Sequence, residues 1–362
     1  MAATVLGAIA LTACTSATAQ PRPAPSAPPP AAAPLATTLV TGQGAWAVLP
    51  MGDTSSSENT FWQVFVRPRT GAAGWQLATP PGVAANGGLV SAGTDSELIV
   101  GFLPSARLTL SPLAASGDAG RTWTPDVIDA PLASVPGALA ASAAGQQAAL
   151  LTDSTIESKA SDGTWSKLAA IGDIAASAPG RSCGVRAMSA LSFWSEGELV
   201  AATDCTRPGI AGIFIRTSGG WLAAGPALPA SYANTKVSVL RLGDQAALLR
   251  AGGDLLASWG QRVSDPLSGV TGVSASGFGA AVTSGQSMWV LLADGRAATI
   301  APGGTWQLLP KAPAGTEVVV PDQGQTQALA ASGGTLTVWR LAGRSWTLVQ
   351  TIKVPINSGS SG

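Results

Sequence analysis

Tryptophan recurs along this chain at nearly even spacing, and no other feature of the sequence constrains the fold as strongly. Gaps of 38 to 56 residues separate seven tryptophans that follow turns rich in Gly or Ser. These residues are Trp75, Trp123, Trp165, Trp221, Trp259, Trp306 and Trp346. The mean gap of about 45 residues is the period of four-stranded blades in a β-propeller. The spacing therefore predicts one all-β propeller over residues 36–356, with seven four-stranded blades, and leaves six or eight blades open.

Segments typical of short strands lie between the turns. Before Trp221 these segments are 188–194, 198–203 and 212–216, and a fourth is expected to begin at Trp221 itself. Charged residues make up only 11% of the chain, and 44 Gly and 26 Pro residues supply many turns. This composition favours short strands over long amphipathic helices, whose exposed faces need charged residues.

The charge balance and the absence of histidine exclude several classes of function. The formal net charge is zero and no basic stripe is present, so nucleic acid is not expected as a partner. A chain without histidine lacks the usual general base near neutral pH and cannot form a Ser-His-Asp or Cys-His site. Zinc sites that contain histidine are excluded too. We therefore expect no cofactor, no metal and no catalytic residue of these kinds.

The first residues are typical of an export signal. Residues 2–13 are small or apolar, too few to span a bilayer, and end in Leu11-Thr12-Ala13-Cys14. This ending resembles the bacterial lipobox, which implies that residues 1–13 are a signal peptide and that Cys14 carries a lipid anchor in the membrane. An ordinary secretory signal cleaved near residues 17–19 is the alternative. The expected positive charge at the start is missing, which leaves the true start codon open.

The segment after Cys14 is predicted to be a disordered tether. Residues 14–35 contain seven prolines between Pro21 and Pro34 and otherwise small or polar residues. Such a composition cannot form a core and favours extended polyproline-II backbone. Residues 357–362 are expected to be a flexible tail.

One turn carries a sharper motif than the others. Residues 116–123 read Ser-Gly-Asp-Ala-Gly-Arg-Thr-Trp and match the Asp-box pattern S-x-D-x-G-x-T-W at every fixed position. The chain here resembles the Asp-box, or BNR-repeat, propellers, which include sialidases and sortilin-like proteins. The expected roles are structural, because an Asp side chain can bond backbone N–H groups in a turn and Gly can adopt a positive φ. The residues concerned are Ser116, Asp118, Gly120, Thr122 and Trp123, of which Thr122 and Trp123 should start a strand and bury the ring between blades.

The two remaining cysteines are expected to form a disulfide. Exported proteins favour disulfides, and Cys14 as a lipid carrier leaves an even pair. Cys183 is predicted in the loop before the first strand of the fourth blade, and Cys205 between the second and third strands of that blade. Both connections leave a four-stranded blade at the same face, so the bond needs no distortion. Two free thiols are the alternative.

The same face is the predicted binding face, because propellers usually bind partners around that mouth of the central channel. For each candidate residue, an ordinary solvated charge is the competing interpretation. The candidates are Asp53, Glu58, Arg107, Arg181, Arg186, Asp204, Arg207, Tyr232 and Lys236.

Three functions fit these observations. The first is a non-catalytic binding or assembly scaffold, lipid-anchored on the outer surface of the cell membrane, with a protein or glycan partner. The second is a sialidase-like glycoside hydrolase, although the chain has a single tyrosine, Tyr232, as a candidate nucleophile and no Arg-Ile-Pro motif. The third is a structural envelope protein without a ligand.

Overall fold

The structure is a computed structural model. The described residues are 37–41, 44–52, 60–69, 74–80, 89–93, 97–102, 111–128, 137–142, 144–151, 154–194, 197–225, 227–228, 230, 236–240, 247–251, 254–258, 267–268, 278–284, 287–301, 304–322 and 324–354.

The described strands form seven four-stranded antiparallel sheets, and each sheet uses four strands that are consecutive in the sequence. The first sheet contains β1 (Thr37–Thr41), β2 (Gly44–Gly52), β3 (Thr60–Pro68) and β4 (Gln76–Leu77). The second contains β5 (Leu89–Gly93), β6 (Leu98–Phe102), β7 (Ser111–Ser116) and β8 (Thr124–Ile128). The third contains β9 (Ala138–Ala141), β10 (Gln147–Leu151), β11 (Thr155–Lys159) and β12 (Trp165–Ala170).

The remaining four sheets repeat this order. The fourth contains β13 (Val185–Phe193), β14 (Leu199–Cys205), β15 (Ile213–Thr217) and β16 (Gly220–Ala223). The fifth contains β17 (Lys236–Leu240), β18 (Ala247–Ala251), β19 (Asp254–Ser258) and β20 (Leu267–Ser268). The sixth contains β21 (Phe278–Ser284), β22 (Ser287–Leu292), β23 (Arg296–Ile300) and β24 (Gln307–Lys311). The seventh contains β25 (Thr316–Asp322), β26 (Gln325–Ser332), β27 (Thr335–Ala342) and β28 (Ser345–Lys353).

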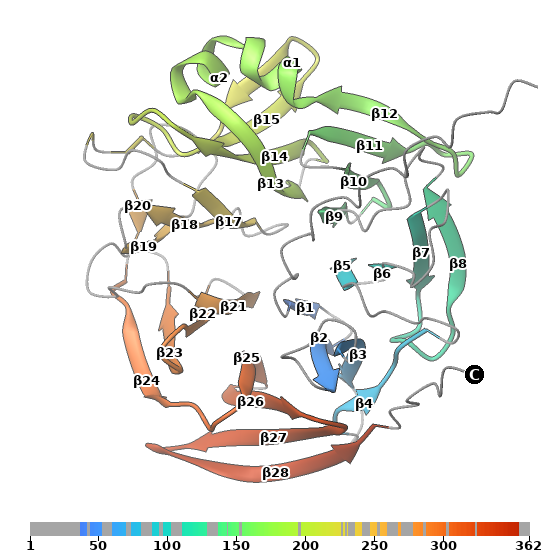
Figure 1. Ribbon diagram of the computed structural model, residues 1–362, viewed down its shortest axis with the longest axis vertical. Coiled ribbons are helices and arrows are strands. Elements are labelled where there is room, and N and C mark those ends of the chain that lie inside the picture. The colour runs from blue at the N-terminus through green and yellow to red at the C-terminus, as the bar shows by residue number, and fades with distance from the viewer. Residues whose placement is uncertain are drawn as a thin grey trace, which may run out of the picture. The chain divides into compact units, whose positions relative to one another are not determined.

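The sheets are arranged around a common centre, with the first strand of each sheet innermost (Figure 1). An apolar cluster fills each interface between neighbouring sheets. For example, Val64 and Leu98 belong to a cluster between the first and second sheets, and Val319 belongs to one between the sixth and seventh. Another cluster joins Leu49 of β2 to Val320 of β25, so the ring also closes between the first and seventh sheets. The chain is therefore an all-β propeller, as the sequence predicts.

The position of a strand in its sheet explains its residue pattern. β14 is buried along almost its whole length, because neighbouring sheets cover both of its faces. Its sequence, LVAATDC, is accordingly a run of small and apolar residues rather than an alternating pattern. β28 lies at the outer edge, and most of its residues are exposed.

The recurring tryptophans mark the start of the fourth strand in the sheets where they are described. Trp165 begins β12, Trp221 and Trp346 are the second residues of their strands, and Trp75, Trp123 and Trp306 lie one residue before theirs. Each packs against the sheet that precedes its own. The prediction that each tryptophan begins the outer strand of a different blade is confirmed for these six to within one residue. Trp259 lies outside the described residues.

Two short helices interrupt the β structure, which the sequence did not predict. α1 (Ile171–Ala176) and α2 (Ala178–Cys183) lie between β12 and β13. Cys183 is consequently the last residue of a helix and not a loop residue, so that prediction was wrong in detail.

Candidate functional site

Each sheet has two ends that carry different connections. Because the strands alternate in direction, the connections between sheets and those between second and third strands lie at one end, which we call the connection face. The first–second and third–fourth turns lie at the other end, which we call the hairpin face. Cys183 and Cys205 lie at the connection face, and the Asp118 turn lies at the hairpin face.

A disulfide fastens the helical connection to the fourth sheet. Cys183 at the end of α2 and Cys205 at the end of β14 are bonded, with their Cα atoms 4.9 Å apart. Both side chains are buried in the cluster that joins the third and fourth sheets. The predicted pairing and its position at the connection face are confirmed.

Backbone bonds reinforce this fastening. The N–H of Arg207 donates to the carbonyl of Cys183 at 3.0 Å, and the N–H of Thr206 donates to that of Gly184 at 3.2 Å. Gly184 ends α2 in the left-handed conformation, with φ of 66°. A Cβ at Gly184 would lie 2.3 Å from the Thr206 hydroxyl, so the close approach of the two segments requires glycine.

Three of the predicted binding residues lie within three positions of a disulfide cysteine in the sequence, and we call this region the arginine corner: Arg181, Arg186 and Arg207. All three are exposed. The guanidinium of Arg207 donates to the backbone carbonyl of Arg181 at 2.9 Å, and that of Arg181 donates to the carbonyl of Ala176. These bonds order the two long side chains while the remaining N–H groups stay available to a partner. Asp204, a further predicted binding residue, is half-buried and is the acidic residue nearest to Arg207 in the sequence.

Asp53, Glu58, Arg107 and Tyr232 lie outside the described residues, and Lys236 is described only as the first residue of β17. Of the predicted binding residues, the structure joins Arg181 and Arg207 by a hydrogen bond and places Arg186 on β13, next to the residue that pairs with Cys205.

An acidic group on an innermost strand was not among the predicted site residues. The first strands of the last four sheets, β13, β17, β21 and β25, contain β-bulges. In β25 the extra residue is Glu317, between Thr316 and Val318. Burial raises the pKa of the Glu317 carboxyl. The sequence around Glu317 does not mark the bulge, because an ordinary turn precedes this residue.

The Asp118 turn has the geometry expected of a structural motif. The carboxylate of Asp118 accepts the N–H of Thr122 at 2.9 Å and its hydroxyl at 2.6 Å, while the Ser116 hydroxyl accepts the N–H of Gly120 at 2.9 Å. These bonds from Thr122 lower the pKa of Asp118 to about 2. Gly120 has a φ of 75°, as predicted, and Ala119 a φ of 59°.

The tryptophan of this turn is placed between sheets, as predicted. Trp123 packs against the cluster between the first and second sheets, and its indole N–H donates to the carbonyl of Ala78 at 3.0 Å. β8 begins at Thr124, so Thr122 closes the turn and does not start the strand. Asp162 makes a similar turn, where bonds from the Thr164 hydroxyl and N–H lower the pKa of the carboxyl.

Within the described part of the chain, no three His, Cys, Asp or Glu side chains are grouped so that they could hold a metal ion. A search of the same residues finds no helix that is long and apolar enough to cross a membrane.

Comparisons with known proteins identify the fold and no family. No protein-family model matches the chain, and no curated protein matches it. Among solved structures, it is similar to YCF48 bound to D1 peptide, with 16% identity and a TM-score of 0.50 over 86% of this chain and 93% of that one. It is also similar to YCF48 from Cyanidioschyzon merolae, with 12% identity and a TM-score of 0.52 over 85% and 95%.

A putative 6-phosphogluconolactonase from Bacteroides uniformis gives 13% identity and a TM-score of 0.54 over 86% and 97% of the two chains. Proteins with different descriptions therefore share this architecture. At such identities the likeness shows the β-propeller fold alone.

Proposed function

We propose that this chain is a non-catalytic binding or assembly scaffold, exported and held on the outer surface of a bacterial membrane by a lipid on Cys14. The lipobox-like ending at Cys14 and the proline-rich residues 14–35 support the anchor and tether. A disulfide in the propeller is in keeping with an oxidising compartment.

The arginine corner is the observation that carries the proposed binding role. A disulfide and backbone bonds fix the segment that presents Arg181 and Arg207, so little conformational entropy is lost when a partner binds. Guanidinium groups match carboxylates in a two-bond geometry. We therefore propose a protein partner that presents acidic side chains to the connection face. The structure of YCF48 with a D1 peptide gives a precedent of a propeller of this overall fold that binds a peptide.

The test is capture from the native envelope with a charge-matched control. The full lipidated protein is cross-linked in cells, and captured proteins are quantified by mass spectrometry for three forms. One form carries Arg181→Glu, Arg186→Glu and Arg207→Glu, and the control carries Arg121→Glu, Arg216→Glu and Arg344→Glu at exposed positions elsewhere. We expect a partner captured by the unchanged protein and the control form to be lost with the arginine-corner form. Equal capture by both variant forms contradicts the proposed site.

We also infer that residues 116–123 are an Asp-box and that the chain is related to the Asp-box propellers. The bonds from Thr122 to Asp118 and the positive φ of Gly120 support this relation. The motif lies at the hairpin face, opposite the arginine corner, so the inferred role of Asp118 is structural.

A further inference from the structure

The ring must close between the first and seventh sheets, where the chain itself makes no connection. Among the described strands, each of these sheets is built from its own four consecutive strands, β1–β4 and β25–β28. Neither sheet borrows a strand from the other end of the described chain. The contacts across this seam are therefore non-covalent, whereas the chain runs on directly from one sheet to the next at each of the other six.

Apolar packing at this seam resembles that at the other seams. Trp75 is buried there, in the same cluster as Phe65 of β3 and Val318 of β25. Trp123 and Trp346 have the same place at their own seams. Packing of this repeated kind does not by itself select the seventh sheet as the partner of the first.

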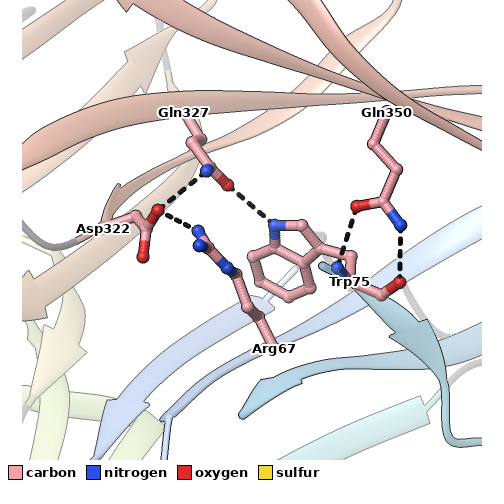
Figure 2. Close-up of polar contacts among 5 residues, drawn as sticks. All are labelled: Arg67, Trp75, Asp322, Gln327 and Gln350. Atoms are coloured by element: carbon pink, nitrogen blue, oxygen red, sulfur yellow. Dashed lines mark hydrogen bonds and ion pairs between the residues drawn. The ribbon is translucent and has the colours of Figure 1, made fainter. Parts of the chain in front are cut away.

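A chain of polar side chains distinguishes the closing seam (Figure 2). The carboxylate of Asp322 on β25 accepts a charge-assisted hydrogen bond from the guanidinium of Arg67 on β3. It also accepts a hydrogen bond of 2.8 Å from the side-chain amide of Gln327 on β26. The oxygen of Gln327 accepts the indole N–H of Trp75 at 2.8 Å. Asp322 and Gln327 thus orient each other toward two groups of the first sheet.

Gln350 on β28 adds a second attachment to Trp75. Its side-chain oxygen accepts the backbone N–H of Trp75 at 2.9 Å, and its side-chain nitrogen donates to the backbone carbonyl of Trp75 at 2.9 Å. The amide side chain therefore pairs with the backbone as a neighbouring strand would. At the connection face, the N–H of Gly52 donates to the carbonyl of Gly333 at 2.8 Å, so the seam is joined there as well.

The tryptophans of the other seams have simpler partners. The indole N–H of Trp123 donates to the backbone carbonyl of Ala78 at 3.0 Å, and that of Trp346 to the carbonyl of Pro310 at 3.3 Å. The indole N–H groups of Trp165 and Trp306 have no hydrogen-bond partner among the described residues. A hydrogen bond from the indole N–H is therefore not required at seams where the chain connects the two sheets. At the first–seventh seam, where it does not, the indole N–H is part of a larger set of hydrogen bonds.

We propose that Arg67, Trp75, Asp322, Gln327 and Gln350 form a closing latch that selects the seventh sheet as the partner of the first and holds the ring shut. Arg67 and Asp322 are only 20% and 15% exposed. Burial, with repulsion from Arg340, lowers the pKa of Arg67, so this cation depends on Asp322 as its counter-charge. A first sheet docked elsewhere would leave these polar groups without partners, which is costly for buried groups.

Hydrogen exchange measured by mass spectrometry on the whole protein tests the latch. The variants are Gln350→Ala and Gly74→Ala. The second changes no latch residue, but its Cβ would lie 2.3 Å from the Gln350 side-chain oxygen and displace it. The control is Gln147→Ala, which removes a bond of 3.3 Å to Glu97 between the second and third sheets, where the chain continues.

Loss of the two hydrogen bonds between Gln350 and the Trp75 backbone should speed backbone amide exchange about tenfold in both β1–β4 and β25–β28. Both sheets are affected because they open together. The third, fourth and fifth sheets should be unchanged, and the control should change exchange only near β6 and β10. Unchanged exchange in β1–β4 for both variants, or an equal rise in all sheets, overturns the proposal. If either variant fails to fold, Trp75→Phe and Gln327→Leu, alone and together, decide. The latch requires the double variant to lower the free energy of opening by less than the sum of the two single variants, and full additivity overturns it.

Discussion

Removal of the disulfide offers a quantitative test of how the helical connection is held. The change is Cys183→Ala together with Cys205→Ala, which removes the bond between α2 and β14 and leaves every other contact of the corner possible. Both side chains are almost fully buried, with 0% and 2% exposed. No solvent-exposed group is altered, so surface charge and solubility should stay the same.

The loss of stability has two parts. The bond closes a loop between residues 22 apart in the sequence. In the chain-entropy treatment a loop of this length contributes roughly 3 kcal/mol to the free energy of unfolding. Each buried sulfur adds about 1 kcal/mol of packing, by analogy with a buried methylene. We expect the double-alanine variant to lose about 5 kcal/mol in all.

Urea unfolding separates the two parts when a third sample is included. The unchanged protein is unfolded and refolded in reductant, so that it keeps both sulfurs but lacks the bond. Relative to the oxidised protein it should lose about 3 kcal/mol, close to 1 M in the urea midpoint for a slope near 3 kcal/mol/M. The double-alanine variant should unfold at a lower urea concentration still. If the reduced and oxidised proteins unfold at the same urea concentration, the bond does not stabilise this corner and the entropic reasoning fails.

Four further predictions concern single features. Cys14→Ala should move the protein from the membrane fraction to the medium or to unprocessed precursor, and continued membrane attachment after processing contradicts lipidation. Because the folded-state pKa of Asp118 is lowered from 3.8 to about 2, its contribution to stability is present above about pH 4 and lost as the pH falls toward 2; the difference in urea midpoint between the unchanged protein and Asp118→Asn should therefore shrink over that interval. Gly120→Ala should cost about 1 to 3 kcal/mol in urea unfolding, because φ is 75° and the added Cβ would lie 2.7 Å from the Ala78 Cβ; a neutral result contradicts the geometry of the turn. The purified protein should not cleave sialosides or aryl glycosides above background, and turnover that disappears with Tyr232→Phe would favour the hydrolase.

The repeated features of the fold are readable from the sequence because they are local. A turn followed by a tryptophan marks the fourth strand in six of the sheets, so Trp165 or Trp346 can be assigned to a fourth strand without knowledge of its neighbours. The Asp118 turn is equally local, since its bonds join residues at most four positions apart. The Cys183–Cys205 bond is longer in range, but the order of strands in a single sheet is enough to bring both residues to one face.

The two helices could not be predicted from periodicity. α1 and α2 have six residues each, less than two turns, which is too short for an apolar repeat to appear. Local signals are nevertheless present. Ser177 caps α2 by accepting the N–H of Gly180 at 3.1 Å, Pro179 lies in the first turn, and Gly184 ends the helix. A serine, a proline and a glycine at these spacings indicate a helix only when capping is examined directly.

The closing latch could not be predicted at all from one sequence. Its bonds join Arg67 to Asp322 and Trp75 to Gln350, pairs separated by 255 and 275 residues. Nothing local marks Gln350, which is one polar residue in a mostly exposed outer strand. Such a pairing becomes visible only when the ring is closed.

Some seams between sheets contain structure beyond the apolar packing that all of them share. A ring of similar sheets needs little more than Trp and small apolar residues at each seam to pack, as the clusters around Trp123 and Trp346 show. Among the described residues, the third–fourth seam also has the helical connection with its disulfide, and the seventh–first seam has the polar chain around Asp322. The first addition orders charged groups at an exposed face, whereas the second satisfies polar groups inside the ring. The proposed binding corner and the proposed closing latch therefore lie at different seams, and a change at the arginine corner should leave hydrogen exchange in β1–β4 unchanged.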